Sequence, residues 1–431
     1  MSIKNSLVKT TRRVLPKKVV KKLENNYRKN RAKLVSSLYG NPASKLKVIA
    51  VTGTNGKTTT VNFLNEILKE AGYKTAMFST ANIEINGNQI RNDLNATVST
   101  SKRMNQFFSD AVKQNVEFAL IEATSHALSQ YKLYGISIEM AIMTNLTQDH
   151  LDYHKTMDNY AKAKSILFKM KPKYIVLNKD DDWFNYFNNF RAVIKKITYG
   201  KDKEADVSIE NIKLYKKGSE AKLKIEKDNV ELANNLAGEF NVYNMTAAAA
   251  GAYLLGVSKE DIQEGIANLE NIAGRFERVE GNQPFEVIVD YAHTPDALEK
   301  LLKTAKKITK NNVIIVFGAC GDRDKKKRPI MGDIAFKNAD KIFITDEESY
   351  NEDPNEIRKQ ILNGIADNKD YTKKVEEIAD RQEAIEKALS IAKKDDTVLI
   401  TGMGHEVYRI INGKKIPWND AEVVKKILNK K

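Results

Sequence analysis

A short glycine-rich segment carries the strongest chemical signal in the sequence. It follows an apolar run at 48–51, precedes a helical pattern, and consists of Gly53, Thr54, Asn55, Gly56, Lys57, Thr58 and Thr59. Glycines let backbone N–H groups close around a phosphate, lysine reaches the outer phosphates, and a threonine hydroxyl ligates Mg²⁺. The GxxGKT spacing is shorter than the commoner GxxxxGKT, and an ordinary glycine turn is the alternative. The strand, loop and helix context favours a site for ATP.

Acidic and imidazole side chains follow two other apolar runs. Glu122 comes directly after the run at 118–121, so a strand there would place it at the carboxyl edge, where open α/β sheets bind ligands. A carboxylate at that edge, across from Thr58, suits Mg²⁺. His150 follows the run at 140–143 and is a candidate second metal ligand. The alternative for 145–152 is a helix N-terminus whose acids favour its dipole, and both interpretations can hold together.

The elements that must position these residues form two α/β units. From Lys47, β-branched runs alternate with helical patterns in the βαβ rhythm of a parallel sheet, and a second series begins near Glu286. Residues 203–236 alternate polar and apolar side chains, which predicts short antiparallel strands appended to the first unit. We therefore expect an α/β fold: a basic, helical N-terminal segment (1–45), a P-loop central domain with a parallel sheet (46–278) and a Rossmann-like C-terminal domain (279–431).

Composition narrows the class of protein. The 431 residues are 42% hydrophobic and 29% charged, ordinary values for folded domains, and the apolar runs are far shorter than the roughly 20 residues of a membrane span. A lone cysteine, Cys320, excludes an internal disulfide and fits a cytoplasmic location. The net charge of +15 gathers in residues 1–47, which hold fourteen Lys or Arg and the single acid Glu24. This basic segment lacks a recognisable module and interleaved aromatic residues, so we expect no nucleic-acid partner.

Nine ordered blocks resemble the Mur ligases, and within them the ligases that add the third residue to the peptide of bacterial cell-wall precursors. The resemblance runs from about Leu38 to the C-terminus. The blocks are VTGTNGKTTT (51–60), IEATSHAL (121–128), TNLTQDHLDYH (144–154), YAKAKSILF (160–168), GEFNVYN (238–244), GRFE (274–277), VDYAHTPDAL (289–298), FGACGDRDKKKRPIMG (317–332) and GMGHE (402–406). It implies that a substrate carboxylate attacks the γ-phosphate of ATP and that an amine then displaces phosphate from the acyl phosphate.

The resemblance also implies catalytic and nucleotide-binding roles. Lys57 would serve the phosphates, and two Mg²⁺ ions would be held by Thr58, Glu122, His150 and Lys164. Lys164 matches a lysine that the family carbamylates, although sequence alone would make it a solvated helix lysine. Further nucleotide-contacting positions are Asn241, Asn244, Arg275, Asp290 and His293.

Two more groups of positions match the family's substrate contacts. Those for the acceptor, a muramoyl dipeptide, are Ser99, Thr100, Thr124, Gln130 and Lys132, although the family usually has Thr-Thr-Pro at 99–101 and arginine at 132. Those for the incoming free amino acid are Arg323, Tyr350, Gly402 and Glu406. Arg323 suits a carboxylate and Glu406 an ammonium group, with a surface salt bridge and a turn as the alternative.

Two departures from the family concern the substrates. Members that add diaminopimelate carry Asp-Asn-Pro-Arg, whose arginine holds the distal carboxylate, whereas residues 347–350 read Glu-Glu-Ser-Tyr. Tyrosine cannot replace a bidentate cation, so we expect lysine or another diamino acid. The family also places a uridine-nucleotide-binding domain before the phosphate loop, where this chain has residues 1–47. We expect a reduced UDP-binding surface or another carrier, with the basic segment on an anionic membrane or a diphosphate; a solvated helix is the alternative.

Two other functions remain as alternatives. A folylpolyglutamate-synthase-like ligase shares the fold and chemistry, but the YAHTPDAL and GDRDKKKRP blocks favour the cell-wall branch. The other is a nucleotide-binding partner subunit that acts on a lipid-linked precursor. Joint retention of the following residues argues against it: Lys57, Glu122, His150, Lys164, Arg323 and Glu406. We expect the protein to be a monomer.

Overall fold

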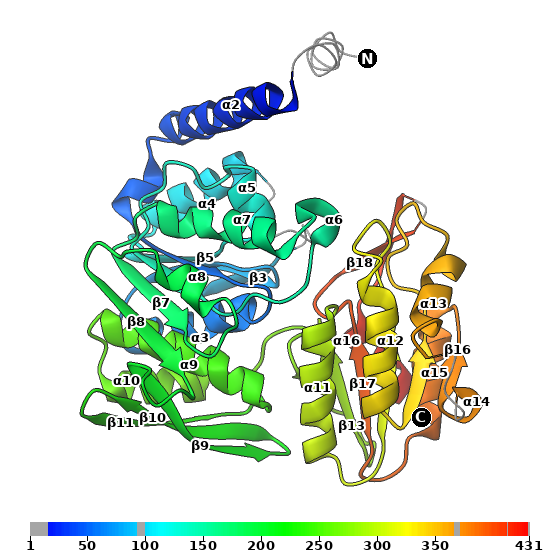
Figure 1. The fold of residues 1–431 in the computed structure, drawn as a ribbon. Helices are drawn as coiled ribbons and strands as arrows, with labels where there is room; N and C mark the ends of the chain where they lie inside the picture. Colours follow the sequence, from blue (N-terminus) through cyan, green and yellow to red (C-terminus); the bar gives the residue numbers. More distant parts are fainter. Residues whose placement is uncertain (1–15, 93–99, 366–370, 412, 430–431) are drawn as a thin grey trace.

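The computed structural model describes residues 16–92, 100–365, 371–411 and 413–429. They form two α/β domains, and a long helix, α2 (Lys17–Leu38), lies on the outer side of the first (Figure 1). Ser99 and residues 1–15 of the basic segment lie outside the described residues. Within the described part of the chain, no helix has the length and apolar character needed to cross a bilayer.

The first sheet has the strand order β11-β10-β9-β8-β7-β6-β1-β5-β2-β3-β4. From β9 to β2 along this order the strands are parallel, and antiparallel strands extend both edges. The expected insert at 203–236 is therefore confirmed as part of the same sheet. The strands are β1 (Lys47–Thr52), β2 (Thr75–Phe78), β3 (Asn82–Ile85), β4 (Asn88–Arg91), β5 (Phe118–Glu122), β6 (Met140–Met143), β7 (Tyr174–Asn178), β8 (Lys195–Gly200), β9 (Val207–Tyr215), β10 (Gly218–Ile225) and β11 (Asp228–Asn234).

Helices cover both faces of this sheet because successive strand residues point to opposite sides. In β1, Ile49 and Val51 join the core beneath α3 (Lys57–Glu70), α9 (Glu239–Leu254) and α10 (Lys259–Asn268). Val48 and Ala50 join a second core with α4 (Ser101–Lys113), α5 (Ser125–Ser129) and α7 (Met157–Lys169). The remaining elements are the short 3₁₀ helix η1 (Pro42–Lys45), α6 (Leu151–His154) and α8 (Phe184–Asn188). Burial on both faces explains why the central strands read as continuous apolar runs.

The second domain is a smaller, doubly covered sheet with the order β12-β13-β17-β14-β15-β16, parallel except for β12. Its strands are β12 (Glu277–Arg278), β13 (Glu286–Asp290), β14 (Val313–Phe317), β15 (Lys341–Ile344), β16 (Val375–Glu377) and β17 (Thr397–Thr401). Around it lie α11 (Pro295–Ile308), α12 (Lys327–Asn338), α13 (Pro354–Leu362), α14 (Tyr371–Lys374), α15 (Arg381–Ile391), α16 (Asp420–Leu428) and the hairpin β18 (Tyr408–Ile411) and β19 (Lys414–Pro417). The predicted α/β class and Rossmann-like second sheet are confirmed.

Candidate active site

The phosphate loop joins β1 to α3, and its glycines are required by close packing. A Cβ on Gly53 (φ +152°) would stand 1.8 Å from the Thr144 hydroxyl, and one on Gly56 (φ +84°) 2.2 Å from the Asn244 side-chain oxygen. The Thr144 hydroxyl also donates to the carbonyl of Asn55 at 2.6 Å. The loop is thus fixed by polar side chains from the end of β6 and from α9.

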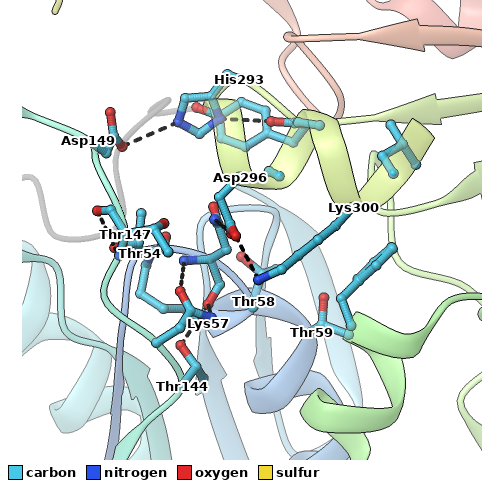
Figure 2. A pocket seen from close by; sticks show the side chains of 18 of the residues that line it. Thr54, Lys57, Thr58, Thr59, Thr144, Thr147, Asp149, His293, Asp296 and Lys300 are labelled. Carbon is cyan, nitrogen blue, oxygen red and sulfur yellow. Dashed lines mark hydrogen bonds and ion pairs between the residues drawn. The ribbon is translucent and has the colours of Figure 1, made fainter. Parts of the chain in front are cut away.

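Lys57 and Thr58 begin α3 and point toward the loop (Figure 2). The Lys57 Nζ donates to the carbonyls of Gly53 at 3.0 Å and Thr54 at 2.7 Å. Burial lowers the pKa of Lys57. An ammonium group whose hydrogen bonds go to neutral carbonyls would gain from an anionic partner, so this end of the site suits phosphate.

Glu122 stands at the end of β5 beside Thr58, as the sequence predicts. Its carboxylate accepts from the Thr58 hydroxyl at 2.8 Å and from the backbone and hydroxyl of Thr80 at 2.6 and 2.9 Å. An Arg275 nitrogen donates to the Thr58 hydroxyl at 3.1 Å. These adjacent hydroxyl and carboxylate oxygens are the kind of ligand that Mg²⁺ prefers, so the pair fits the ion. In the described residues, no cluster of three or more His, Cys, Asp or Glu forms a metal site on its own.

Lys164 is buried, not solvated, which corrects the interpretation from sequence alone. Its side chain lies on the inner face of α7 and is 1% exposed. The Nζ donates to the carbonyl of Gly53 at 2.6 Å and lies 4.6 Å from the centre of the Tyr160 ring. Burial and the neighbouring Lys57 lower the pKa of Lys164 well below its ordinary value. The helix therefore delivers an amine to the back of the phosphate loop.

Asp149 is a hub that the sequence analysis missed. Its carboxylate lies 3.2 Å from His150 Nε2, 3.7 Å from His293 Nε2 and 3.7 Å from Lys327 Nζ. Burial alone would raise the pKa of Asp149, but Lys327 and the imidazoles hold it well below its ordinary value. Figure 2 shows Asp149 beside His293, which belongs to the second domain. The position of Asp149 immediately before the candidate ligand His150 was the signal in the sequence that could have identified it as a site residue.

His150 adopts a left-handed backbone conformation (φ 53°) at the start of α6. Such a conformation is uncommon for a residue other than glycine and is often found at functional sites. Burial lowers the pKa of His150 to about 3, so its imidazole is neutral at physiological pH. The expected helix N-terminus is confirmed, and the neutral ring keeps a nitrogen lone pair for an electrophile.

The two domains enclose a cavity of about 870 Å³ that collects most of the predicted site. Asn55 in the phosphate loop donates to Asp296 of α11 at 2.8 Å and helps to join its two sides. The predicted residues that line the cavity are Thr54, Asn55, Gly56, Lys57, Thr58, Thr59, Glu122, Thr124, Lys132, His150, Asn241, Asn244, Arg275, Asp290, His293, Arg323, Tyr350, Gly402 and Glu406. Most of the residues predicted from the sequence therefore lie around one cavity.

The predicted nucleotide contacts come from three segments. Asn241 and Asn244 lie one turn apart on α9, and the Asn244 amide donates to the Asn241 oxygen at 3.3 Å. The Arg275 guanidinium stacks 4.5 Å above the Tyr291 ring. Asp290, at the end of β13, accepts from the backbone of residues 276 and 292, and burial raises its pKa. These groups are held by contacts within the protein.

Only some of the residues predicted to contact the acceptor line the cavity. The Thr124 hydroxyl caps α5, and burial lowers the pKa of Lys132; both residues line the cavity. The Thr100 hydroxyl caps α4 by accepting from the backbone of residue 103 at 3.1 Å. Thr100 and Gln130, the residue that ends α5, are not among the cavity-lining residues. Ser99 lies outside the described residues.

Three carboxylates gather at the other end of the cavity. Glu348 accepts from the Tyr350 hydroxyl at 2.9 Å, and Glu406 accepts from the Tyr291 hydroxyl at 3.2 Å. Glu347 accepts from the backbone N–H of residue 318 at 3.2 Å and is 3% exposed. Burial and mutual repulsion raise the pKa values of Glu348 and Glu406. A bound cation would relieve this repulsion.

Arg323, Tyr350 and Gly402 complete this end. The Arg323 guanidinium lies 5.0 Å from the centre of the Tyr350 ring and 3.5 Å from its hydroxyl. Gly402 has φ +105°, and a Cβ there would stand 1.9 Å from a Glu347 oxygen. Glu406 is 8% exposed and accepts from Tyr291, so the alternative of a surface salt bridge is wrong for Glu406. The sequence analysis noted Glu347 and Glu348 only because they differ from the family motif, and it did not predict them as site residues. Glu348 nevertheless lines the cavity.

Comparisons with known proteins agree with this geometry. Two family models match, the Mur ligase middle domain over residues 51–252 and the Mur ligase glutamate ligase domain over residues 274–404. UDP-N-acetylmuramoyl-L-alanyl-D-glutamate–2,6-diaminopimelate ligase 1 of Clostridium acetobutylicum is 40% identical over 417 residues, which cover 96% of this chain and 84% of that protein.

The solved structures that match this chain also include a diaminopimelate-adding ligase. A UDP-N-acetylmuramoyl-L-alanyl-D-glutamate–2,6-diaminopimelate ligase matches with 34% identity and a TM-score of 0.62, over 89% of this chain and 78% of that one. Folylpolyglutamate synthase of Mycobacterium tuberculosis, solved with ADP and AMPPCP, matches with a TM-score of 0.70 and 17% identity, over 87% of this chain and 92% of that one. At that identity the second match shows a shared fold alone.

Proposed function

This chain belongs to the Mur ligase family, and from this premise we propose that it joins a diamino acid to the peptide of a UDP-linked muramoyl dipeptide. As a Mur ligase it is an ATP-dependent acid–amino-acid ligase. The observation that carries the proposal is the shared cavity, which Lys57 and Thr58 face from one domain and Arg323 and Glu406 from the other. Relatives with about 40% identity are named as ligases that act on such a dipeptide and on 2,6-diaminopimelate.

The chain's own cations match the charge that develops in this reaction. The acceptor carboxylate attacks the γ-phosphorus, the bond to ADP breaks, and negative charge spreads over the transferred phosphoryl oxygens. Lys57, Arg275 and Lys327 line the phosphate end and would neutralise that charge. The amine then attacks the acyl phosphate, phosphate leaves, and the proton lost from nitrogen passes to solvent or a nearby base.

Thr58 and Glu122 are the residues we propose for one Mg²⁺, because their oxygens already adjoin at 2.8 Å. When bound, the ion supplies positive charge next to the phosphate oxygens. For a second ion we propose His150 and a carbamylated Lys164. The buried Lys164, with its lowered pKa, favours the neutral amine that combines with CO₂ to give a carbamate and a proton.

The choice of amino acid rests on the carboxylate-rich end. Glu348 and Glu406 suit an ammonium group, which fits the diamino acid named for the relatives. The expectation of lysine in place of diaminopimelate remains a prediction and runs against the relatives' named substrate. It is supported by Tyr350, whose hydroxyl bonds to Glu348 where other members supply an arginine for a distal carboxylate. We expect the reaction to occur in the cytoplasm, where ATP is supplied.

Release of ADP by the purified protein tests the proposal. ADP should appear only when ATP, Mg²⁺, a muramoyl dipeptide and a diamino acid are supplied together, and mass spectrometry should show the tripeptide product. Crossing UDP-linked with UDP-free acceptors determines the carrier, and size-exclusion chromatography with light scattering tests the expected monomer. Extension of a folate acceptor by glutamate would instead support the folylpolyglutamate-synthase alternative, and ADP release without an acceptor would contradict the proposal.

A further inference from the structure

Helix α2 carries an exposed apolar stripe that the proposed reaction does not use. The helix lies outside the first domain and packs against α4 (Figure 1). Its exposed apolar side chains are Val19 (42%), Leu23 (51%), Tyr27 (62%), Leu34 (62%) and Leu38 (76%). Their intervals of four, four, seven and four residues place them on one face of the helix. We call this face the α2 stripe.

The opposite face of α2 is the one that packs on the protein. Ala32 is 3% exposed and lies about 160° around the helix from Leu34, since each residue turns the helix by about 100°. On the same packed side, the Lys29 ammonium lies 4.9 Å from the centre of the Tyr131 ring and 5.3 Å from that of Tyr134. The α2 stripe is therefore turned away from the domain.

Basic residues border the α2 stripe. On a helix of 3.6 residues per turn, Lys22 and Lys33 fall on one side of it and Arg31 on the other. The helix sequence contains eight Lys or Arg residues and the single acid Glu24, which lies 3.9 Å from Arg28. Long basic side chains at such borders can rest their methylene groups on an apolar surface while their charges reach polar groups.

We propose that α2 binds the protein to the surface of an anionic lipid bilayer, with the α2 stripe inserted among the lipids. An apolar stripe flanked by Lys and Arg, in a helix too charged to span a membrane, is the pattern of an interfacial helix. Charge selects this occupant over a second copy of the chain, because pairing two stripes would bring bordering cations together, whereas anionic headgroups attract them.

Docking in this way would also orient the active site. Tyr131, which packs under Lys29, is the neighbour of Lys132, and Lys132 lines the cavity between the domains. The end of the cavity that contains Lys132 would therefore lie near the lipid surface. The inference stands on α2 alone and does not depend on which substrate the cavity takes.

Co-sedimentation of the full chain with lipid vesicles tests the proposal. Vesicles of equal parts phosphatidylglycerol and phosphatidylcholine should bind the wild-type protein, and phosphatidylcholine vesicles should bind it far less. The triple variant Leu23→Ser/Tyr27→Ser/Leu34→Ser should bind anionic vesicles on the order of a hundredfold more weakly, because three side chains no longer enter the lipid. Lys22→Gln/Arg31→Gln should weaken binding about tenfold and reduce its dependence on salt.

A matched control removes equally exposed apolar groups elsewhere. Val193→Ser/Ile194→Ser/Tyr215→Ser, at side chains 65%, 60% and 46% exposed, should bind vesicles like the wild type. All variants should keep the wild-type melting temperature and ADP release, which separates this test from that of the proposed function. Equal vesicle binding by the stripe variant and the wild type would overturn the proposal. A wild-type dimer that dissociates when the stripe residues are replaced would also overturn it. So would a wild-type protein that binds inorganic pyrophosphate through the basic residues of α2 and does not bind vesicles.

Discussion

The two ends of the cavity carry side chains of opposite charge. At the phosphate end, the Lys57 ammonium group donates to carbonyl oxygens of the phosphate loop, and an anion would improve its surroundings. At the amino-acid end, Glu347, Glu348 and Glu406 crowd together, and a cation would improve theirs. Like charges therefore repel one another at the amino-acid end, whereas the phosphate end offers a cation to an incoming anion. We propose that the first end binds the phosphates and that the second selects the amine.

Lys57→Ala should break the phosphate end with the largest effect. Loss of a buried cation aimed at the transferring phosphoryl group should lower kcat/KM for ATP roughly a thousandfold in the ADP-release assay. Lys69→Ala on the same helix, where the partly exposed lysine pairs with Glu66 and Glu84 and does not line the cavity, is the matched control and should stay near wild type. A loss of less than about tenfold for Lys57→Ala would show that the loop works without this cation.

Asp149→Asn should loosen the seam between the domains without touching the loop. The variant leaves Lys327 buried without its carboxylate and weakens the contact with His293, so both second-domain groups should shift. We expect kcat/KM to fall on the order of a hundredfold, the cost typical of a small misplacement. Asp333→Asn, in an exposed pair with Lys337, is the control. Wild-type activity in Asp149→Asn would contradict a role for the hub in closing the site.

Tyr350→Arg tests which amino acid the carboxylate-rich end of the cavity prefers. An arginine there would add a cation next to Glu348 and could pair with a distal carboxylate, so kcat/KM for diaminopimelate relative to lysine should rise about tenfold. Competition between the two amino acids, read from the masses of the products, measures the ratio. A wild-type enzyme that already prefers diaminopimelate, with a ratio unchanged by the substitution, would show that residue 350 does not select the substrate.

Glu406→Gln should stabilise the folded protein at alkaline pH. The raised pKa of Glu406 means that its ionisation opposes folding at neutral and alkaline pH, while glutamine can still accept from the Tyr291 hydroxyl. The variant should raise the free energy of unfolding by about 1 kcal/mol at pH 8. This gain should vanish at about pH 4, where Glu406 is protonated in the folded protein. Thermal melts at both pH values measure it, with the exposed Glu422→Gln as control; a destabilised variant at pH 8 would contradict the stored repulsion.

The same contrast explains what the sequence could predict. The positions of the phosphate loop, Glu122 and His150 after strands could be predicted, because they depend on local spacing along the chain. Burial of Lys164 was missed from sequence alone, because YAKAKSILF does not reveal which helix face meets the sheet. Asp149 was missed because its partners His293 and Lys327 lie far along the chain. For α2, the sequence predicted a basic helix that could lie on an anionic membrane, but it could not show which face of the helix would pack on the domain.

The stoichiometry of the complete reaction tests whether the two ends of the cavity act together. Purified protein with ATP, Mg²⁺, a UDP-linked muramoyl dipeptide and a diamino acid should form one tripeptide for each ADP released, and omission of either the dipeptide or the amino acid should abolish both products. ADP release that ignores the amino acid, or binding of ATP without any tripeptide, would contradict a cavity whose two ends act together.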